Sequence, residues 1–208
     1  MQDDHIAWFE ELGIDDVPRV GGKNASLGEM VGTLRAKGVR VPDGFATTAL
    51  AYRKFITANG IANDMAARIS AMKNGTATLQ QTGSAIRRLF LDSDFPPRIS
   101  GAIRRAYSEL SERIGTGEAS VAVRSSATAE DLPQASFAGQ QETFLNVSGE
   151  RALIDACRRC FASLFTDRAI SYRETQGFDH MEVALSIGVQ HMVRSDLAGF
   201  GFKDSTAT

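Results

Sequence analysis

Cysteine is scarce in this sequence of 208 residues, which has only two cysteines and three histidines. Cys157 and Cys160 form a Cys-Arg-Arg-Cys segment, with no second cysteine pair and no histidine close in sequence. A zinc site needs more ligands than this pair provides. Residues three apart share one face of a helix, so we expect both thiols to lie in the core. A redox function for the pair is the weaker alternative.

Long apolar segments and blocks of like charge are also absent. No run of about 18 apolar residues occurs that could span a membrane, and the first residues lack a basic and apolar leader. A net charge of -2 argues against nucleic-acid binding. With 43% hydrophobic and 23% charged residues, the composition is that of a globular protein with one core or two small ones. We therefore expect no membrane or nucleic-acid partner and a cytoplasmic location.

Residues 120–139 carry the residue types of a phosphate site. Ser120 to Val123 are mostly apolar and β-branched, which predicts a buried strand that ends at Arg124. The guanidinium group of arginine can hold phosphate oxygens through two parallel hydrogen bonds. Ser125, Ser126 and Thr128 then offer hydroxyl donors, and the small residues of 135–139 would let backbone N–H groups approach an anion.

Lys23 is a second candidate phosphate ligand, in the segment Val-Gly-Gly-Lys-Asn. Apolar residues recur at helical spacing from Asn24 onward, so Lys23 is predicted at a helix N-terminus, where the dipole favours anions. The alternative is a flexible turn with a solvated lysine. The segment is not a Walker A loop, because Val17 and Asn24 stand where that motif needs glycine and Ser or Thr.

The periodicity predicts an α/β protein with a helix-rich block and a small, mostly antiparallel sheet. His191 shares the apolar face of the strand 183–193, so we expect it to be packed rather than catalytic. Pairs of adjacent arginines, Arg87 with Arg88 and Arg104 with Arg105, are expected on solvated helix faces. The edge after Val193 is expected to be unpaired. Helices are predicted at 50–58, 61–72, 78–91, 97–114 and 149–172, a strand and turn at 39–48, a short apolar element at 6–12, and strands near 120, 142 and 183.

Five long segments carry a family resemblance. They are Val-Gly-Gly-Lys-Asn-Ala-Ser-Leu-Gly-Glu-Met at 20–30, Val-Pro-Asp-Gly-Phe-Ala-Thr-Thr at 41–48, the segment 121–147, Phe-Ala-Ser-Leu-Phe-Thr-Asp-Arg-Ala-Ile-Ser-Tyr-Arg at 161–173, and the segment 183–198. In these segments the sequence resembles the phosphoenolpyruvate synthase (pyruvate, water dikinase) family, in the N-terminal part of its ATP-grasp nucleotide-binding domain. The resemblance covers roughly residues 6 to 198.

The resemblance implies an ATP site assembled from two subdomains. The first supplies a lysine and an arginine, matched by Lys23 and Arg124, with Ser125 beside the arginine. A loop of the first subdomain is matched by Ser136 to Gln141, with Ser136, Gly139, Gln140 and Gln141 as the expected ligands. The second subdomain supplies carboxylates for Mg²⁺ and a further arginine, which have no counterpart here, and His5, His180 and His191 match no catalytic histidine. The cofactor implied is ATP, and the metal ligands are expected to be missing.

The last ten residues depart from the resemblance. We expect residues 1–198 to be an incomplete AMP/ATP-binding domain and residues 199–208 to be a tail of other origin, such as a frameshift, an early stop or a gene fragment. Phosphoryl transfer depends on charge neutralisation by metal and cationic groups. The expectation is therefore weak ATP binding with negligible turnover.

Two other functions stay open from the sequence. Rifampicin phosphotransferases carry a similar Gly-Gly-Lys segment and a similar Val-Arg-Ser-Ser-Ala-Thr-Ala-Glu-Asp segment, and they send phosphate to an antibiotic. A non-catalytic interaction module that pairs with an intact enzyme is the second alternative. In that case the face that the second subdomain would cover is exposed, and self-association through this face is expected.

Overall fold

The computed structural model describes residues 4–39, 41–128 and 142–193. Within these ranges the centre of the fold is a five-stranded sheet in the order β1-β2-β5-β3-β4. Each neighbouring pair is antiparallel, which confirms the predicted sheet and adds two strands to it. The strands are Ile6–Trp8 (β1), Gly44–Thr47 (β2), Val121–Ala127 (β3), Thr143–Val147 (β4) and Leu185–His191 (β5).

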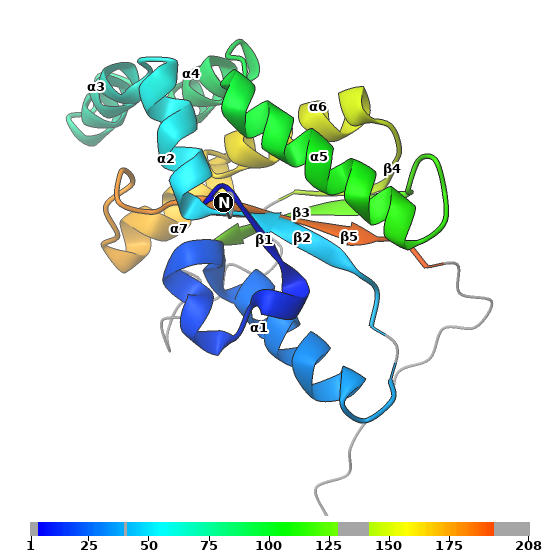
Figure 1. Cartoon of the computed structure of the whole chain (residues 1–208). Helices are drawn as coiled ribbons and strands as arrows, with labels where there is room; N and C mark the ends of the chain where they lie inside the picture. Colours follow the sequence, from blue (N-terminus) through cyan, green and yellow to red (C-terminus); the bar gives the residue numbers. More distant parts are fainter. Residues whose placement is uncertain (1–3, 40, 129–141, 194–208) are drawn as a thin grey trace, which may run out of the picture.

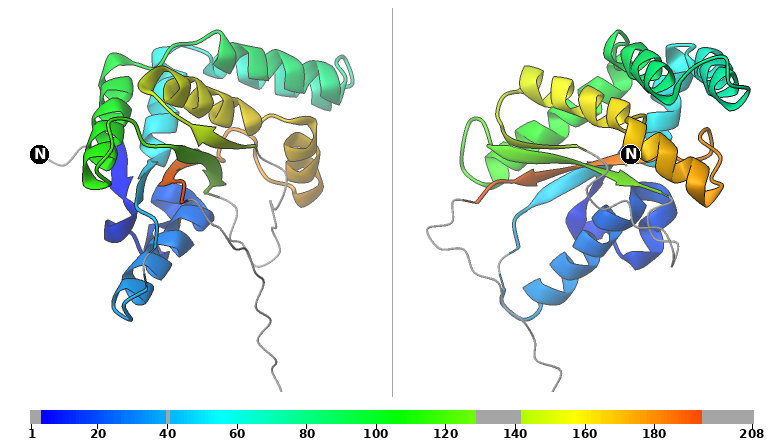
Figure 2. Two further views of the ribbon diagram at one scale, coloured as in Figure 1. Left: turned by 90° about the vertical axis from the view of Figure 1, so that its right-hand side faces the viewer. Right: turned by 180° about the vertical axis from the view of Figure 1, so that it is seen from behind.

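Helices cover both faces of the sheet (Figures 1 and 2). One face carries α1, next to two short 3-10 turns at Phe9–Glu11 and Ile14–Asp16, and the remaining helices lie on the other face. Within the described ranges, no helix is long and apolar enough to cross a bilayer. The helices are Val17–Arg35 (α1), Ala49–Ala58 (α2), Ala62–Lys73 (α3), Leu79–Leu91 (α4), Pro97–Arg113 (α5), Glu150–Ser163 (α6) and Asp167–Gln176 (α7).

Predictions for the four middle helices are confirmed, but the single helix expected at 149–172 is wrong. The chain turns between α6 and α7, where the Thr166 side chain accepts a hydrogen bond from the Ala169 backbone N–H at 3.3 Å. A threonine in this position begins a new helix because it satisfies an otherwise unpaired donor. Arg87, expected on a solvated face, is half-buried and donates to the Phe165 carbonyl at 2.7 Å and to Asp167 at 3.1 Å. It therefore holds α4 against this turn.

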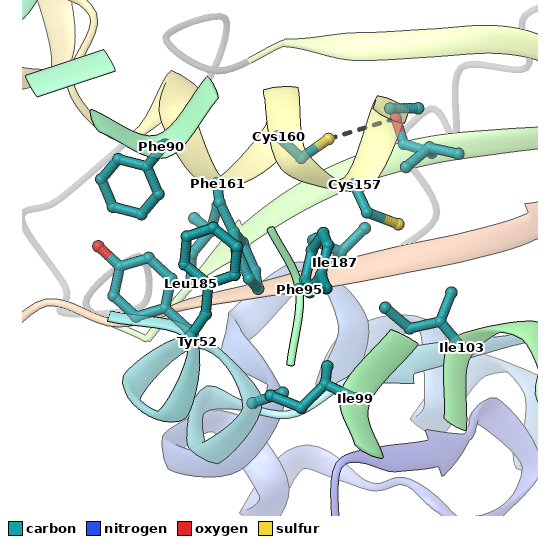
Figure 3. Packing of buried hydrophobic residues seen from close by; sticks show 14 of the residues in the cluster. Tyr52, Phe90, Phe95, Ile99, Ile103, Cys157, Cys160, Phe161, Leu185 and Ile187 are labelled. Carbon is teal, nitrogen blue, oxygen red and sulfur yellow. Dashed lines mark hydrogen bonds between the residues drawn. The ribbon is translucent and has the colours of Figure 1, made fainter. Parts of the chain in front are cut away.

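The larger core lies between the sheet and helices α2 to α7 (Figure 3). Aromatic rings of Tyr52, Phe55, Phe90, Phe95 and Phe161 meet there with ring centroids 4.9–5.9 Å apart. Such contacts add to the stability gained from apolar burial. A smaller core beneath α1 is formed by Ala7, Phe9, Leu12, Val20, Ala25, Val31 and Ala46.

Cys157 and Cys160 lie in the larger core, as predicted. Both side chains are fully buried, and the Cys160 Sγ atom is 3.9 Å from the Val123 carbonyl oxygen. Burial raises the pKa of both thiols far above its ordinary value. Because the thiolate is the reactive form, this environment disfavours the redox function.

Arg124 lies in the middle of a strand, not at its end, so that prediction is wrong. β3 continues through Ser125 and Ser126 because β5 pairs with it over its full length, from Val121 opposite His191 to Ala127 opposite Leu185. The strand carries small residues at this point because α1 crosses directly over them.

The predicted unpaired edge after Val193 is also wrong for the described part of the sheet. β5 lies between β2 and β3, and the edges are β1 and β4. β5 is shorter than the predicted strand, and His191, at its end, is half-buried.

Candidate functional site

The site begins at a break inside α1. Gly21 has φ 71° and ψ 163°, so the long part of the helix starts after it and Lys23 lies in its first turn, as predicted. A Cβ atom on Gly21 would lie 2.4 Å from the Ser126 Oγ atom and 2.6 Å from the Ser126 carbonyl oxygen. Glycine is required here for both its conformation and its size. It allows the start of the helix to contact β3.

Asn24 fixes the start of this helix to two strands. Its backbone N–H donates to Ser126 Oγ at 3.3 Å, and its side-chain amide donates to Ser186 Oγ at 2.9 Å and to the Val20 carbonyl at 3.2 Å. The Ser186 hydroxyl donates in turn to the Thr47 carbonyl at 2.5 Å. These groups are buried, and a satisfied buried network holds its members rigidly. Lys23 is therefore attached to a helix of defined position.

Arg124 extends from the same face of β3 as Ser126. Its Nη2 atom donates to the Oε1 atom of Gln190, and the Nε2 atom of Gln190 donates to the Pro42 carbonyl at 3.3 Å. Gln190 thus orients the guanidinium group from the neighbouring strand. The rest of the Arg124 side chain is exposed and can accept a ligand.

Lys23 and Arg124 line one cavity of about 200 Å³. Because α1 lies across β3 and β5, the two cations meet although they are far apart in sequence. None of the described lining residues is a carboxylate, so the cavity favours an anion. The other lining residues are Phe9, Asn24, Leu27, Met30, Ser125 and Gly188.

Ser125 borders the cavity, but the alternation of β3 directs its side chain to the face opposite Arg124 and Ser126. Two hydroxyl groups predicted as phosphate donors have partners within the fold. Ser126 accepts from the Asn24 backbone, and the Thr128 hydroxyl exchanges hydrogen bonds with Ala184 at 3.2 Å in both directions. The predicted ligands Ser136, Gly139, Gln140 and Gln141 lie outside the described residues.

Three features of the site were missed in the sequence. Asn24 was considered only as a departure from a Walker A loop, and its role depends on two strands that are distant in sequence. The role of Gln190 likewise depends on contacts between distant segments, since only the pairing of β3 with β5 places it beside Arg124. The apolar wall of Phe9, Leu27 and Met30 could have been suspected from the helical spacing of the last two residues.

The part of the chain that the structure describes brings no carboxylates for a metal ion together at this cavity. Among the described residues, no group of three or more His, Cys, Asp or Glu side chains is placed to hold a metal. Mg²⁺ prefers oxygen ligands, above all carboxylates, and the charged groups here are a lysine and an arginine. The described residues therefore fit an anion and do not fit Mg²⁺.

Comparison with known proteins shows which family the sequence of this chain matches. The family model for the pyruvate phosphate dikinase, AMP/ATP-binding domain matches residues 17–208. A phosphoenolpyruvate synthase from Synechocystis sp. is 56% identical over 98% of this chain and 25% of its own length. The enzymes from Neisseria meningitidis and Escherichia coli are each 53% identical, over 97% and 98% of this chain and 25% and 26% of their own lengths.

The chain thus spans about a quarter of the length of the curated relatives that it matches. Its α/β architecture is consistent with the ATP-grasp-type fold expected for such a domain. The extent of the match and the identity to these relatives show that the chain belongs to the pyruvate phosphate dikinase AMP/ATP-binding domain family.

Proposed function

We propose that this chain is the ATP-binding part of a phosphoenolpyruvate synthase, and that Lys23 and Arg124 contact the phosphates of ATP. The observation that carries the proposal is the convergence of these two cations in one cavity whose described lining contains no carboxylate. The family match indicates that the nucleotide is ATP, and the names of the relatives indicate the enzyme.

The residues of the cavity would bind and position the nucleotide. The planar guanidinium of Arg124, oriented by Gln190, can form two parallel hydrogen bonds to phosphate oxygens, whereas Lys23 supplies a mobile point charge. The positive end of the long part of α1 adds to this potential. Ser136, Gly139, Gln140 and Gln141 are proposed as further phosphate ligands on the strength of the family resemblance.

Turnover by this chain alone is expected to be negligible. Phosphoryl transfer depends on accurate positioning and on neutralisation of the phosphate charge by metal and cationic groups. The cavity supplies cations, and a Mg²⁺ ion that accompanies ATP would need carboxylates from outside the described residues. In this proposal the described residues bind ATP, while phosphoryl transfer needs metal ligands from outside them.

The complete enzyme is proposed to phosphorylate pyruvate with ATP and water through a phosphohistidine, in the cytoplasm. The relatives favour this acceptor over an antibiotic, because three relatives that match over nearly all of this chain carry the name phosphoenolpyruvate synthase. Self-association through the face beside the cavity stays a proposal, supported by the 49% exposure of Met30.

Calorimetric titration of the folded chain with Mg·ATP tests the binding role. Lys23→Ala and Arg124→Ala should each raise the dissociation constant by roughly tenfold or more, since a hydrogen bond to a charged group contributes about 1.5–3 kcal/mol. Arg88→Ala is the matched control. Arg88 is an exposed arginine on α4, with Asp92 4.0 Å away as its ion-pair partner, and its removal should leave binding unchanged.

Three outcomes would contradict the proposal. Equal affinity in all four proteins would remove Lys23 and Arg124 from the site. No heat from a chain shown to be folded would favour the interaction module instead. ATP hydrolysis that disappears in Arg124→Ala would show that the chain turns over without further parts.

A further inference from the structure

A second hollow lies between α2 and the beginning of α5, and it shares no lining residue with the cavity at Lys23. Figure 1 shows the two helices near the N-terminal strand, on the face of the sheet opposite α1. We call this hollow the α2–α5 groove. Its volume is about 470 Å³, and the apolar side chains of Leu50, Pro96 and Ile99 are part of its lining. Volumes of roughly 300–1,000 Å³ are typical of sites for small molecules.

The outer face of α2 is built differently from an ordinary solvated helix face. Leu50, Arg53, Lys54 and Thr57 recur at the spacing of one helical stripe, and all four line the groove. Leu50 is 40% exposed, although the opposite face of α2 already supplies the core contacts. The long side chains of arginine and lysine add hydrocarbon surface beneath their charged ends. The groove therefore has an apolar floor beside cationic groups.

The three cations of the groove are poorly neutralised. Within the described ranges, neither Lys54 nor Arg98 forms an ion pair, and Arg53 only donates to the Glu182 carbonyl oxygen at 3.4 Å. No described residue of the lining is acidic. Arg104 and Arg113, on the same helix as Arg98, each have a carboxylate partner within 3.2 Å. The positive potential at the groove is thus left for a ligand.

We propose that the α2–α5 groove binds a small anionic amphiphile, a molecule with one carboxylate joined to a hydrocarbon body. The hydrocarbon lies on Leu50, Pro96 and Ile99, and the carboxylate is held by Lys54 and Arg98. Arg98 is in the first turn of α5, where the helix dipole adds to the attraction. Apolar burial supplies most of the affinity, and the cations select the charge of the head group.

Titration of the folded chain with octanoate, 1-octanol and octylamine tests this proposal. These probes share one hydrocarbon length and differ in charge. Two-dimensional ¹H–¹⁵N NMR spectra show whether the backbone amide signals of α2 and of Ile99 shift when a probe is added. Octanoate should bind most tightly, and the double variant Lys54→Glu, Arg98→Glu should weaken it by about tenfold or more. Octylamine binding should not weaken in the same variant.

Matched controls separate the groove from general surface effects. Leu50→Ser should weaken octanoate binding, whereas Leu91→Ser, at an equally exposed leucine of 43% on α4, should not. Arg88→Glu places the same charge reversal on α4 and should leave the affinity unchanged. A loss of affinity in either control would contradict a site at the groove, as would equal binding of the three probes.

The outcome is independent of the proposed ATP site. Lys23→Ala should bind octanoate as the unaltered chain does, because Lys23 does not line the groove. Competition between octanoate and Mg·ATP that disappears in Lys23→Ala would place octanoate in the other cavity and overturn the proposal. If the chain does not bind ATP but octanoate still shifts the NMR signals of α2 and Ile99 alone, the groove is supported and only the proposed nucleotide site is contradicted.

Discussion

His180 is held between two charged residues in the connection from α7 to β5. Its Nδ1 atom accepts a hydrogen bond from the Nε atom of Arg173 at 2.8 Å, so the ring proton must be on Nε2. Nε2 is 2.5 Å from the Glu174 carboxylate and can donate to it. Burial of the ring, followed by the positive charge of Arg173, holds the pKa of His180 below its ordinary value of 6.5. The folded protein therefore favours the neutral imidazole.

The neutral His180 makes stability depend on pH in a defined direction. As the pH falls below about 6.5, the unfolded chain gains a proton on this residue while the folded chain does not, so the free energy of unfolding decreases until the pH passes the lowered pKa. Urea unfolding between pH 7.5 and 5.5 measures this decrease. His180→Asn retains an acceptor for Arg173 and cannot titrate, so its decrease should be smaller.

The Glu174 carboxylate does not interfere in this pH window. Its hydrogen bond with His180 lowers its pKa below the ordinary value of 4.5, so its contribution is lost only in more acidic solution. Equal pH dependence in the unaltered chain and in His180→Asn would show that His180 does not stabilise the fold through its neutral form.

Single residues of the site were predictable when their chemistry did not depend on neighbours. Lys23 and Arg124 were chosen as phosphate candidates because a lysine at a helix start and an arginine beside a buried strand suit phosphate in almost any context, and the two residues line one cavity. The structural partners of Ser126 and Thr128 were not foreseen, because a hydroxyl group can bond to a ligand or to the backbone with equal ease. The position of α1 over β3 gives Ser126 its partner, whereas Thr128 bonds to the backbone of Ala184, just before β5.

At the scale of the element, the candidate site depends on the break in α1 at Gly21. The backbone there is in the left-handed region with φ 71°, and the missing side chain lets the helix start pack on Ser126. An L-residue in this conformation is strained, and a Cβ atom would also overlap the strand. The helix can approach β3 this closely only with glycine.

Gly21→Ala should therefore reduce the free energy of unfolding by roughly 2–4 kcal/mol, from backbone strain and overpacking together. Gly32→Ala is the matched control, since Gly32 is helical in the same element and a Cβ atom there would have no neighbour within 4 Å. It should raise stability by about 0.4–1 kcal/mol. Urea unfolding followed by circular dichroism measures both. A Gly21→Ala chain as stable as the Gly32→Ala chain would contradict the tight approach.

Whole elements were predicted well where one face is apolar and glycine or proline marks the ends. This is why α2 to α5 were found with errors of one residue or so. The turn between α6 and α7 was missed because the apolar residues continue through Phe161, Leu164 and Phe165 and hide the change of direction. Thr166, a good N-cap followed by Asp167, was the signal that could have located it.

At the scale of the whole molecule, the buried thiols provide a direct measure of global opening. Cys157 and Cys160 are the two cysteines of the chain, and both lie where the sheet, α5 and α6 meet. A thiol reagent in solution reaches such groups only when the core opens. The reaction rate therefore reports unfolding, with no surface thiol to obscure it.

Under native conditions, both thiols should react with an aromatic disulfide reagent at least about a thousandfold more slowly than in urea, since domains of this kind are stable by about 5 kcal/mol or more. Saturating Mg·ATP should slow the native reaction further, because a ligand that binds only the folded state stabilises it. Lys23→Ala should remove this effect of ATP without exposing the thiols. Fast reaction of one cysteine with unchanged circular dichroism would instead reveal local opening at α6, and the core between the sheet and the helices would then not act as one cooperative unit.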